Sequence, residues 1–169
     1  MADETPLDES PLEEQRKATI AKYTEAGKLP KDQWITHDEL YAALAILYPS
    51  AVRGRDVVVA HMVEPETNAQ LSSAFIALWK IDGVPEPSLA ELMQAVAPHV
   101  ETAKATVRAR DVRWDRNARL DASDRLITRA MESEDAGKIA ALKTYRQALR
   151  DVPQQAGFPT TIEWPEAPQ

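Results

Sequence analysis

The positions of its twelve prolines constrain the fold of this chain more than any other feature. Proline lacks a backbone donor and clashes with the preceding helical turn, so helix interiors rarely contain it. Pro30, Pro49 and Pro98 therefore limit the first part of the chain to short elements, whereas the stretch between Pro98 and Pro153 can form long helices. The remaining prolines near the end, Pro159, Pro165 and Pro168, predict a stiff, extended tail.

Three capping boxes mark the starts of helices in the first part of the chain. In this motif a serine or threonine side chain accepts a hydrogen bond from the third helical residue, whose glutamate bonds back to the cap. The pairs are Ser10 with Glu13, Thr36 with Glu39, and Ser88 with Glu91. Apolar residues at helical spacing follow the second and third pairs, so we expect helices that end before Pro49 and at Pro98.

Two runs rich in β-branched or aromatic residues lie between the second and third of these helices. Residues 56–63 and 75–81 each have the composition of a strand, and a polar loop separates them. We expect them to pair as an antiparallel hairpin that packs on the flanking helices, because an isolated hairpin is only marginally stable in water. Trp79 falls on the predicted core face of the second strand.

The stretch after Pro98 predicts two long helices. From Val100, apolar residues recur on one helical face for roughly thirty residues, and this face, which we expect to be buried, includes Trp114. The acidic run around Glu132, together with Gly137, indicates a turn. The last helix then runs to Asp151.

The fold class that this pattern predicts is α+β and mostly helical. Residues 1–33 form an acidic segment and a helical arm, and residues 34–98 form a small unit with a β-hairpin packed on helices. Residues 99–169 form a helical region with an extended, proline-rich tail. Because residues 1–9 carry four acidic groups and little to bury, we expect them to be disordered or peripheral.

Charge and composition argue against several classes of function. A net charge of −7 disfavours nucleic acid or an anionic membrane as the partner. The chain has no cysteine, so it has no disulfide, thiolate metal site or cysteine nucleophile. The acidic start is unlike a signal peptide, and no run reaches the ~18 apolar residues of a membrane-spanning helix. We therefore expect a cytoplasmic protein with neither nucleic acid nor membrane as partner.

No residue pattern indicates catalysis, a cofactor or a metal. His37, His61 and His99 lie far apart in the sequence and share no ligand spacing. The five glycines are dispersed at the ends of predicted elements, so no phosphate-binding loop is present. Carboxylates fall in first helical turns and on solvated faces, where capping explains them. The sequence predicts a protein that is not an enzyme and has no catalytic, cofactor-binding or metal-binding residues.

Residues 101–130 hold eight basic and five acidic groups. Such a cluster fits a helix that binds nucleic acid, a patch for an acidic protein partner, or an exposed helix stabilised by its own ion pairs. The basic and acidic residues are interleaved at helical spacing, which favours the exposed helix. A protein partner is the next alternative.

The tail carries apolar side chains that a monomer has little reason to expose. Phe158, Ile162 and Trp164 lie on one side of a segment that prolines keep extended. The tail could fold back on its own helices or dock on another chain, because both arrangements bury the aromatic rings. The sequence leaves both alternatives open.

The order of residues near the C-terminus resembles that of the phage tail assembly chaperone family, whose members are also called tail fibre assembly proteins. The resemblance is carried by the run Tyr145–Pro153, by Phe158-Pro159 and by Trp164–Pro168. Residues 39–93 also resemble small tail-associated proteins of phages, through Tyr48-Pro49, the two strands and Pro85-x-Pro87-Ser88.

These resemblances imply a non-catalytic protein that assists tail or tail-fibre assembly in the host cytoplasm. The implied partner is a phage tail or tail-fibre protein, and a second copy of the chain is a further partner to consider. The alternative is a structural component of the virion at the baseplate or tail-fibre junction, located in the tail. The residues expected to bind the partner are Tyr145, Arg146, Arg150, Phe158, Ile162 and Trp164.

Overall fold

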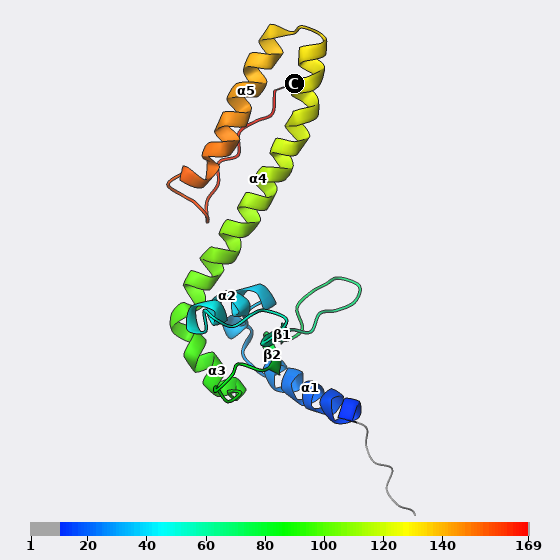
Figure 1. Cartoon of the computed structure of the whole chain (residues 1–169), viewed down its shortest axis with the longest axis vertical. Coiled ribbons are helices and arrows are strands. Elements are labelled where there is room, and N and C mark those ends of the chain that lie inside the picture. Colours follow the sequence, from blue (N-terminus) through cyan, green and yellow to red (C-terminus); the bar gives the residue numbers. More distant parts are fainter. Residues whose placement is uncertain (1–10, 169) are drawn as a thin grey trace, which may run out of the picture. The chain divides into compact units, whose positions relative to one another are not determined.

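A computed structural model describes residues 11–168. The predicted behaviour of residues 1–9, and the capping role predicted for Ser10, lie outside the described residues. The chain divides into two compact units, residues 1–103 and 104–169. Helices predominate, with one small antiparallel sheet, which confirms the predicted α+β class (Figure 1).

The first unit contains short helices and the sheet. Its elements are α1 (Pro11–Gly27), η1 (Lys31–Gln33), α2 (His37–Leu47), β1 (Val57–Ala60), β2 (Phe75–Trp79), α3 (Leu89–Val96) and η2 (Ala97–His99). Helix α4 (Val100–Glu132) begins directly after η2, so Pro98 interrupts the helical path without a loop. This agrees with the break that Pro98 predicts.

The two described capping boxes form as predicted. At the start of α2, the backbone N–H of Glu39 donates to Thr36 Oγ1 over 3.3 Å, and the N–H of Thr36 donates to Glu39 Oε2 over 2.8 Å. Ser88 and Glu91 repeat this exchange at the start of α3, also at 3.3 and 2.8 Å. These bonds fix where the two helices enter the core.

The hairpin is shorter than the sequence predicts. Strands β1 and β2 pair antiparallel from Val57 opposite Trp79 to Ala60 opposite Phe75, with an irregularity after Val58. Beyond Ala60 the regular ladder ends: the Met62 N–H donates to the side chain of Ser72 over 3.0 Å, and only an isolated antiparallel bridge between Val63 and Gln70 follows. Periodicity alone does not predict this side-chain bond.

The core of the first unit lies between the hairpin and helices α2 and α3, as predicted. Its buried side chains include Leu40, Ala43, Leu44, Val57, Val59, Ile76, Leu92 and Val96. Trp79 is half-buried at the edge of this core, where its ring meets that of Tyr48 edge-on at 5.2 Å. The indole N–H donates to the carbonyl of Val84 over 2.8 Å.

Helix α1 joins its own unit through its C-terminal half. Ala26 is fully buried, and its carbonyl accepts a hydrogen bond from the Ser73 N–H over 3.3 Å. Leu12, near the start of the helix, is exposed. Helix α1 is therefore anchored at its C-terminal end, which is consistent with an arm.

The second unit is a helical hairpin followed by the tail. Helix α5 (Ala136–Asp151) runs antiparallel to α4 and leads through η3 (Val152–Gln154) into the last segment (Figure 1). Leu142, Leu149 and Val152 are fully buried here. Asp135 caps α5 by accepting from the Lys138 N–H over 2.9 Å. Gly137 lies inside the first turn of α5, so its predicted place in the inter-helix turn is wrong.

The predicted burial of Trp114 is also wrong, since this side chain is 76 % exposed. On α4, Ala103 is buried in the core of the first unit, and it shares a face with Trp114. In the second unit, the buried residues of α4 are Ser123 and Ala130. Ser123 follows Trp114 by nine residues, about two and a half helical turns, and so lies on the opposite side.

Candidate partner-binding site

The tail turns back directly after α5. The Phe158 N–H donates to the carbonyl of Gln155 over 3.0 Å, and the Thr160 and Thr161 N–H groups both donate to the carbonyl of Gly157, over 2.8 and 2.7 Å. The peptide bond between Phe158 and Pro159 is cis. The tail is therefore extended only from Ile162 onward, and the predicted extension from Phe158 is wrong.

The side chain of Gln155 holds the extended part of the tail in place. Its amide nitrogen Nε2 donates to the Glu163 carbonyl over 2.8 Å, and its Oε1 accepts from the Glu163 N–H over 3.0 Å. This two-bond exchange is what one residue of a β-ladder would offer to its neighbour. It fixes the position of Glu163, and with it the side chains on either side.

Two arginines of α4 lie over the two aromatic rings of the tail. The guanidinium carbon of Arg113 is 5.2 Å from the centre of the Phe158 ring, and that of Arg119 is 4.5 Å from the Trp164 ring. Both distances fall within the range of cation–π attraction. The arginines and the rings are each six residues apart, so the tail follows the direction of α4. The tail thus lies along a helix of its own unit.

Sequence reasoning missed the helix side of this contact. The charge pattern places Arg113 and Arg119 among the basic residues of an exposed helix, and no motif singles out Gln155 or Gly157. The equal spacing of the arginines and of the rings is the one signal that could have pointed to the pairing. That spacing is too common to be recognised without the fold.

The predicted binding residues of α5 divide into two kinds. Tyr145 is only 8 % exposed. Arg146 crosses to α4, where its Nη1 donates to the carbonyl of Leu120 over 3.2 Å and to the side chains of Ser123 and Asp124. These two residues therefore pack within the unit. Arg150 is exposed on α5.

The predicted residues of the tail remain partly accessible. Phe158, Ile162 and Trp164 are each half-buried, so each presents one side to solvent while the other lies against the unit. The tail and Arg150 together form what we call the tail surface, made of Arg150, Phe158, Ile162 and Trp164. Binding of a partner to these residues stays a prediction.

Two of the three histidines, which lie far apart in the sequence, meet in the first unit. The backbone N–H of His37 donates to His61 Nδ1 over 3.1 Å, and the ring centres are 6.0 Å apart. Burial, and next the neighbouring His37, lower the pKa of His61 from its ordinary value, whereas Asp38 acts in the opposite direction. Among residues 11–168, no cluster of three or more His, Asp or Glu side chains could hold a metal ion.

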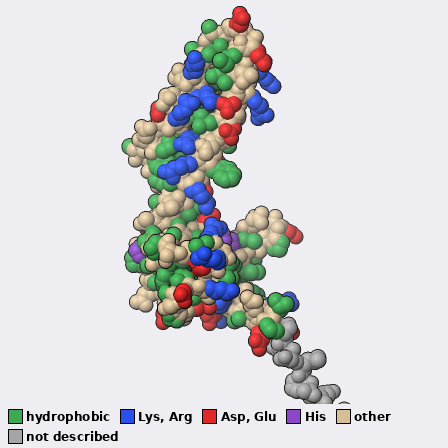
Figure 2. Space-filling view, in the orientation of Figure 1, with side chains coloured by type: hydrophobic (Ala, Val, Ile, Leu, Met, Phe, Trp, Pro, Cys, Tyr) green, Lys and Arg blue, Asp and Glu red, His purple; other side chains and the backbone are tan. Residues whose placement is uncertain are grey.

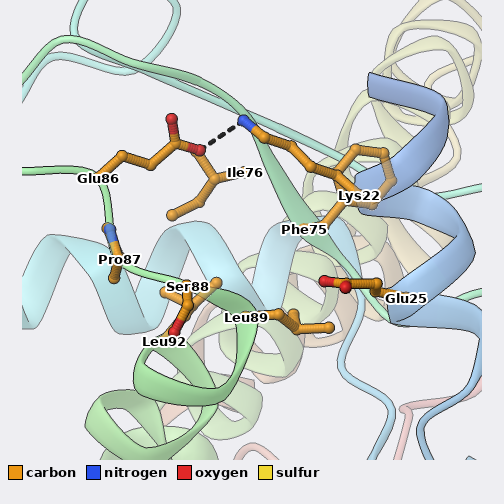
Figure 3. A pocket seen from close by; sticks show the side chains of 9 residues that line it. All are labelled: Lys22, Glu25, Phe75, Ile76, Glu86, Pro87, Ser88, Leu89 and Leu92. Atoms are coloured by element: carbon orange, nitrogen blue, oxygen red, sulfur yellow. Dashed lines mark hydrogen bonds and ion pairs between the residues drawn. The ribbon is translucent and has the colours of Figure 1, made fainter. Parts of the chain in front are cut away.

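A small pocket opens in the first unit between α1, β2 and the start of α3 (Figure 3). It has a volume of about 230 Å³, and Phe75, Leu89 and Leu92 supply its apolar lining. Lys22 Nζ and Glu86 Oε1 pair across it at 2.5 Å. Ser88 in its wall donates to Glu91 over 2.7 Å as part of the helix cap. The Lys22–Glu86 pair and the Ser88–Glu91 bond thus help to hold α1 and the start of α3 in place.

Two family models match the chain in separate regions. Residues 40–104 match the model described as XkdW protein, and residues 109–169 match the model described as phage tail assembly chaperone protein. The second of these matches supports a role in phage tail assembly. It runs from within α4 to the end of the tail and confirms the resemblance to the phage tail assembly chaperone family that the C-terminal motifs predict.

No curated protein and no solved structure gives a significant match. In the part of the chain that the structure describes, none of the helices is both long enough and apolar enough to cross a membrane.

Proposed function

We propose that this protein assists phage tail or tail-fibre assembly without catalysis, by binding a tail or fibre protein through the tail surface of its second unit. The observation that carries the proposal is the extent of the chaperone match, which covers residues 109–169 and hence the paired arginines and the whole tail. Binding takes place in the host cytoplasm during assembly.

The construction of the tail supports this role. Aromatic side chains in the centre of an interface commonly supply most of its binding energy. Here Arg113 and Arg119 hold two such rings in place. The Gln155–Glu163 bonds fix the extended segment directly before the second ring. A pre-ordered segment loses little conformational entropy on binding, so more of the contact energy appears as affinity.

The chemistry of the tail surface also indicates what kind of client segment fits it. Ile162 and the two rings offer apolar area, and Arg150 offers a permanent positive charge at an exposed position of α5. A client segment with an apolar side chain next to a carboxylate would match both features. No reacting group is required for such a contact.

The test is co-purification of the tagged full chain from phage-infected cells, with the captured proteins identified by mass spectrometry. We expect a tail or fibre protein with the wild type, and at least tenfold less of it with Trp164→Ala, since interface tryptophans often contribute ~2 kcal/mol or more. Leu71→Ala, which removes an exposed apolar side chain from the first unit, is the matched control and should capture the client normally.

Two outcomes would contradict the proposal. Capture of the same tail protein by wild type and Trp164→Ala alike would show that the tail surface is not the contact. Recovery of the chain in stoichiometric amounts from purified particles would instead favour a structural component at the baseplate or fibre junction.

A further inference from the structure

The pocket between α1, β2 and the start of α3 combines apolar walls with a carboxylate that lacks a partner. Phe75, Ile76 and Leu92 are buried in its walls, and Leu89 is half-buried. Glu25 projects from α1 into this space (Figure 3). In the part of the chain that the structure describes, the Glu25 carboxylate forms no hydrogen bond or ion pair. The pocket therefore offers apolar contact and a negative charge at the same place.

The other two charged side chains of the pocket neutralise each other. Lys22 Nζ is 2.5 Å from Glu86 Oε1, and Figure 3 shows Lys22 reaching towards Glu86 and away from Glu25. Lys22 is the cation among the lining residues, so the lining as a whole keeps one negative charge. The charge of Glu25 is thus left for a cation from outside the pocket.

We propose that this pocket binds a lysine or arginine side chain of a protein partner. The methylene stem of such a side chain packs between Phe75 and Leu89, and its charged end pairs with Glu25. Lysine and arginine match both features of the pocket, because each carries an apolar stem and a cationic head. The proposal does not rest on the tail surface, which belongs to the second unit.

The size of the pocket favours a single side chain as its occupant. Its volume is about 230 Å³, below the roughly 300–1,000 Å³ of pockets that hold drug-sized ligands. A molecule of that size would protrude into solvent, whereas one long side chain can enter while its backbone stays outside. The occupant is therefore assigned to a protein partner and not to a free small molecule.

The charge of the first unit also favours a basic segment of a partner. Residues 1–103 hold eight basic and seventeen acidic groups, whereas residues 104–169 hold twelve basic and ten acidic ones. In Figure 2, Lys and Arg side chains gather along the helical hairpin of the second unit, and Asp and Glu side chains lie on the visible surface of the first. An excess of negative charge attracts a cationic segment and repels an acidic one.

The test is an NMR titration of the isotope-labelled full chain with blocked five-residue peptides. Alanines flank a central lysine, arginine or norleucine, and norleucine has an alkyl side chain without the charge. We expect saturable shifts at the backbone amides of Phe75, Ile76 and Leu89, with dissociation constants on the order of millimolar because one side chain supplies the contact. The cationic peptides should bind roughly three- to fivefold more tightly than the norleucine peptide, as a solvent-exposed ion pair allows, and less so at high salt.

Variants of α1 assign this preference to the carboxylate. Glu25→Gln should abolish the preference for a cationic peptide and leave binding of the norleucine peptide unchanged. Glu14→Gln is the matched control, because Glu14 is an exposed carboxylate in the first turn of the same helix, and it should behave as wild type does. Lys22→Met frees Glu86 and should increase the preference, a gain that misfolding cannot produce. Circular dichroism of each variant verifies that the helices remain folded.

Several results would overturn the proposal. These are the absence of saturable shifts at the pocket amides, equal affinities for the cationic and norleucine peptides, and an unchanged preference in Glu25→Gln. Tighter binding of putrescine than of either cationic peptide would assign the pocket to a small diamine. A dimer of the full chain that Glu25→Gln abolishes would assign it to a second copy. Client capture through the tail surface is measured with other variants, so either result can fail alone.

Discussion

The guanidinium of Arg119 lies 4.5 Å from the centre of the Trp164 ring and so joins the middle of α4 to the end of the tail. The Gln155–Glu163 bonds hold the same segment one residue before the ring. Trp164 is therefore a packing residue of the second unit as well as part of the tail surface. These two roles can be tested separately, because the free energy of unfolding and the capture of the client are independent measurements.

Trp164→Ala should lower the free energy of unfolding by about 1–2 kcal/mol. This is less than the ~3–5 kcal/mol for a fully buried aromatic residue, since the ring is only half-buried, and it includes a cation–π contribution of about 0.5–1 kcal/mol. Urea denaturation followed by circular dichroism measures the change. Arg119→Gln should lower the free energy of unfolding by the cation–π contribution alone. A free energy of unfolding unchanged in both variants would mean that the tail is not held against α4 in solution.

Gly157→Ala should destabilise the tail turn, because a Cβ at this position would lie 2.3 Å from the carbonyl oxygen of Thr161. The backbone would have to move, and we expect a cost of more than ~1 kcal/mol. Gly137→Ala is a matched control in the first turn of α5, where the nearest atom, Asp135 Oδ1, is 3.5 Å away. This second change should stabilise the protein by up to ~1 kcal/mol through helix propensity. Melting temperatures that shift in the same direction in both variants would contradict the turn geometry.

The features of this fold that the sequence predicts depend on residues that lie close together in the chain. The capping boxes at Thr36 and Ser88 depend on residues only three apart, so the sequence alone places the starts of α2 and α3. The hairpin between them could be predicted from its two apolar runs, although not its length. The bond from the Met62 N–H to the Ser72 side chain, just beyond the ladder, joins residues ten apart in the sequence.

Contacts between distant residues were the part that could not be predicted. The apolar spacing predicts that Trp114 is buried, whereas it is exposed and the second unit buries Ser123 of α4 instead. The tail follows α4 because Arg113 and Arg119 meet rings that are forty-five residues away in each case. His37 and His61 meet because the end of β1 reaches the start of α2.

Arg146→Met should destabilise the helical hairpin. Its guanidinium donates to the Leu120 carbonyl and to the side chains of Ser123 and Asp124, so its removal leaves acceptors on α4 without that partner. Hydrogen bonds of charged groups are worth about 1.5–3 kcal/mol, and we expect a loss in that range by urea denaturation. Arg150→Met, at an exposed position on the same helix, should stay within ~0.5 kcal/mol of wild type. Equal effects of the two substitutions would show that Arg146 does not tie α5 to α4.

Acidification should weaken the first unit through His61. The His61 Nδ1 accepts the His37 N–H bond only while it carries no proton, and a charge there would face the positive end of α2. Asp38 partly offsets this, Tyr41 contacts the His37 ring edge-on, and Arg53 adds a cation over Tyr41. The folded pKa of His61 is therefore lower than its unfolded value.

The unfolded chain thus binds more protons than the folded one between these two pKa values, so stability falls as the pH falls through this range. At a pH above the ordinary histidine value, about 6.5, the full stability is retained. We expect melting temperatures to decrease from pH 7.5 to pH 5.5. His61→Asn keeps an acceptor oxygen near the Nδ1 position but cannot titrate, so its melting temperature should vary less over the same interval. An identical pH dependence in both proteins would assign the effect to groups other than His61.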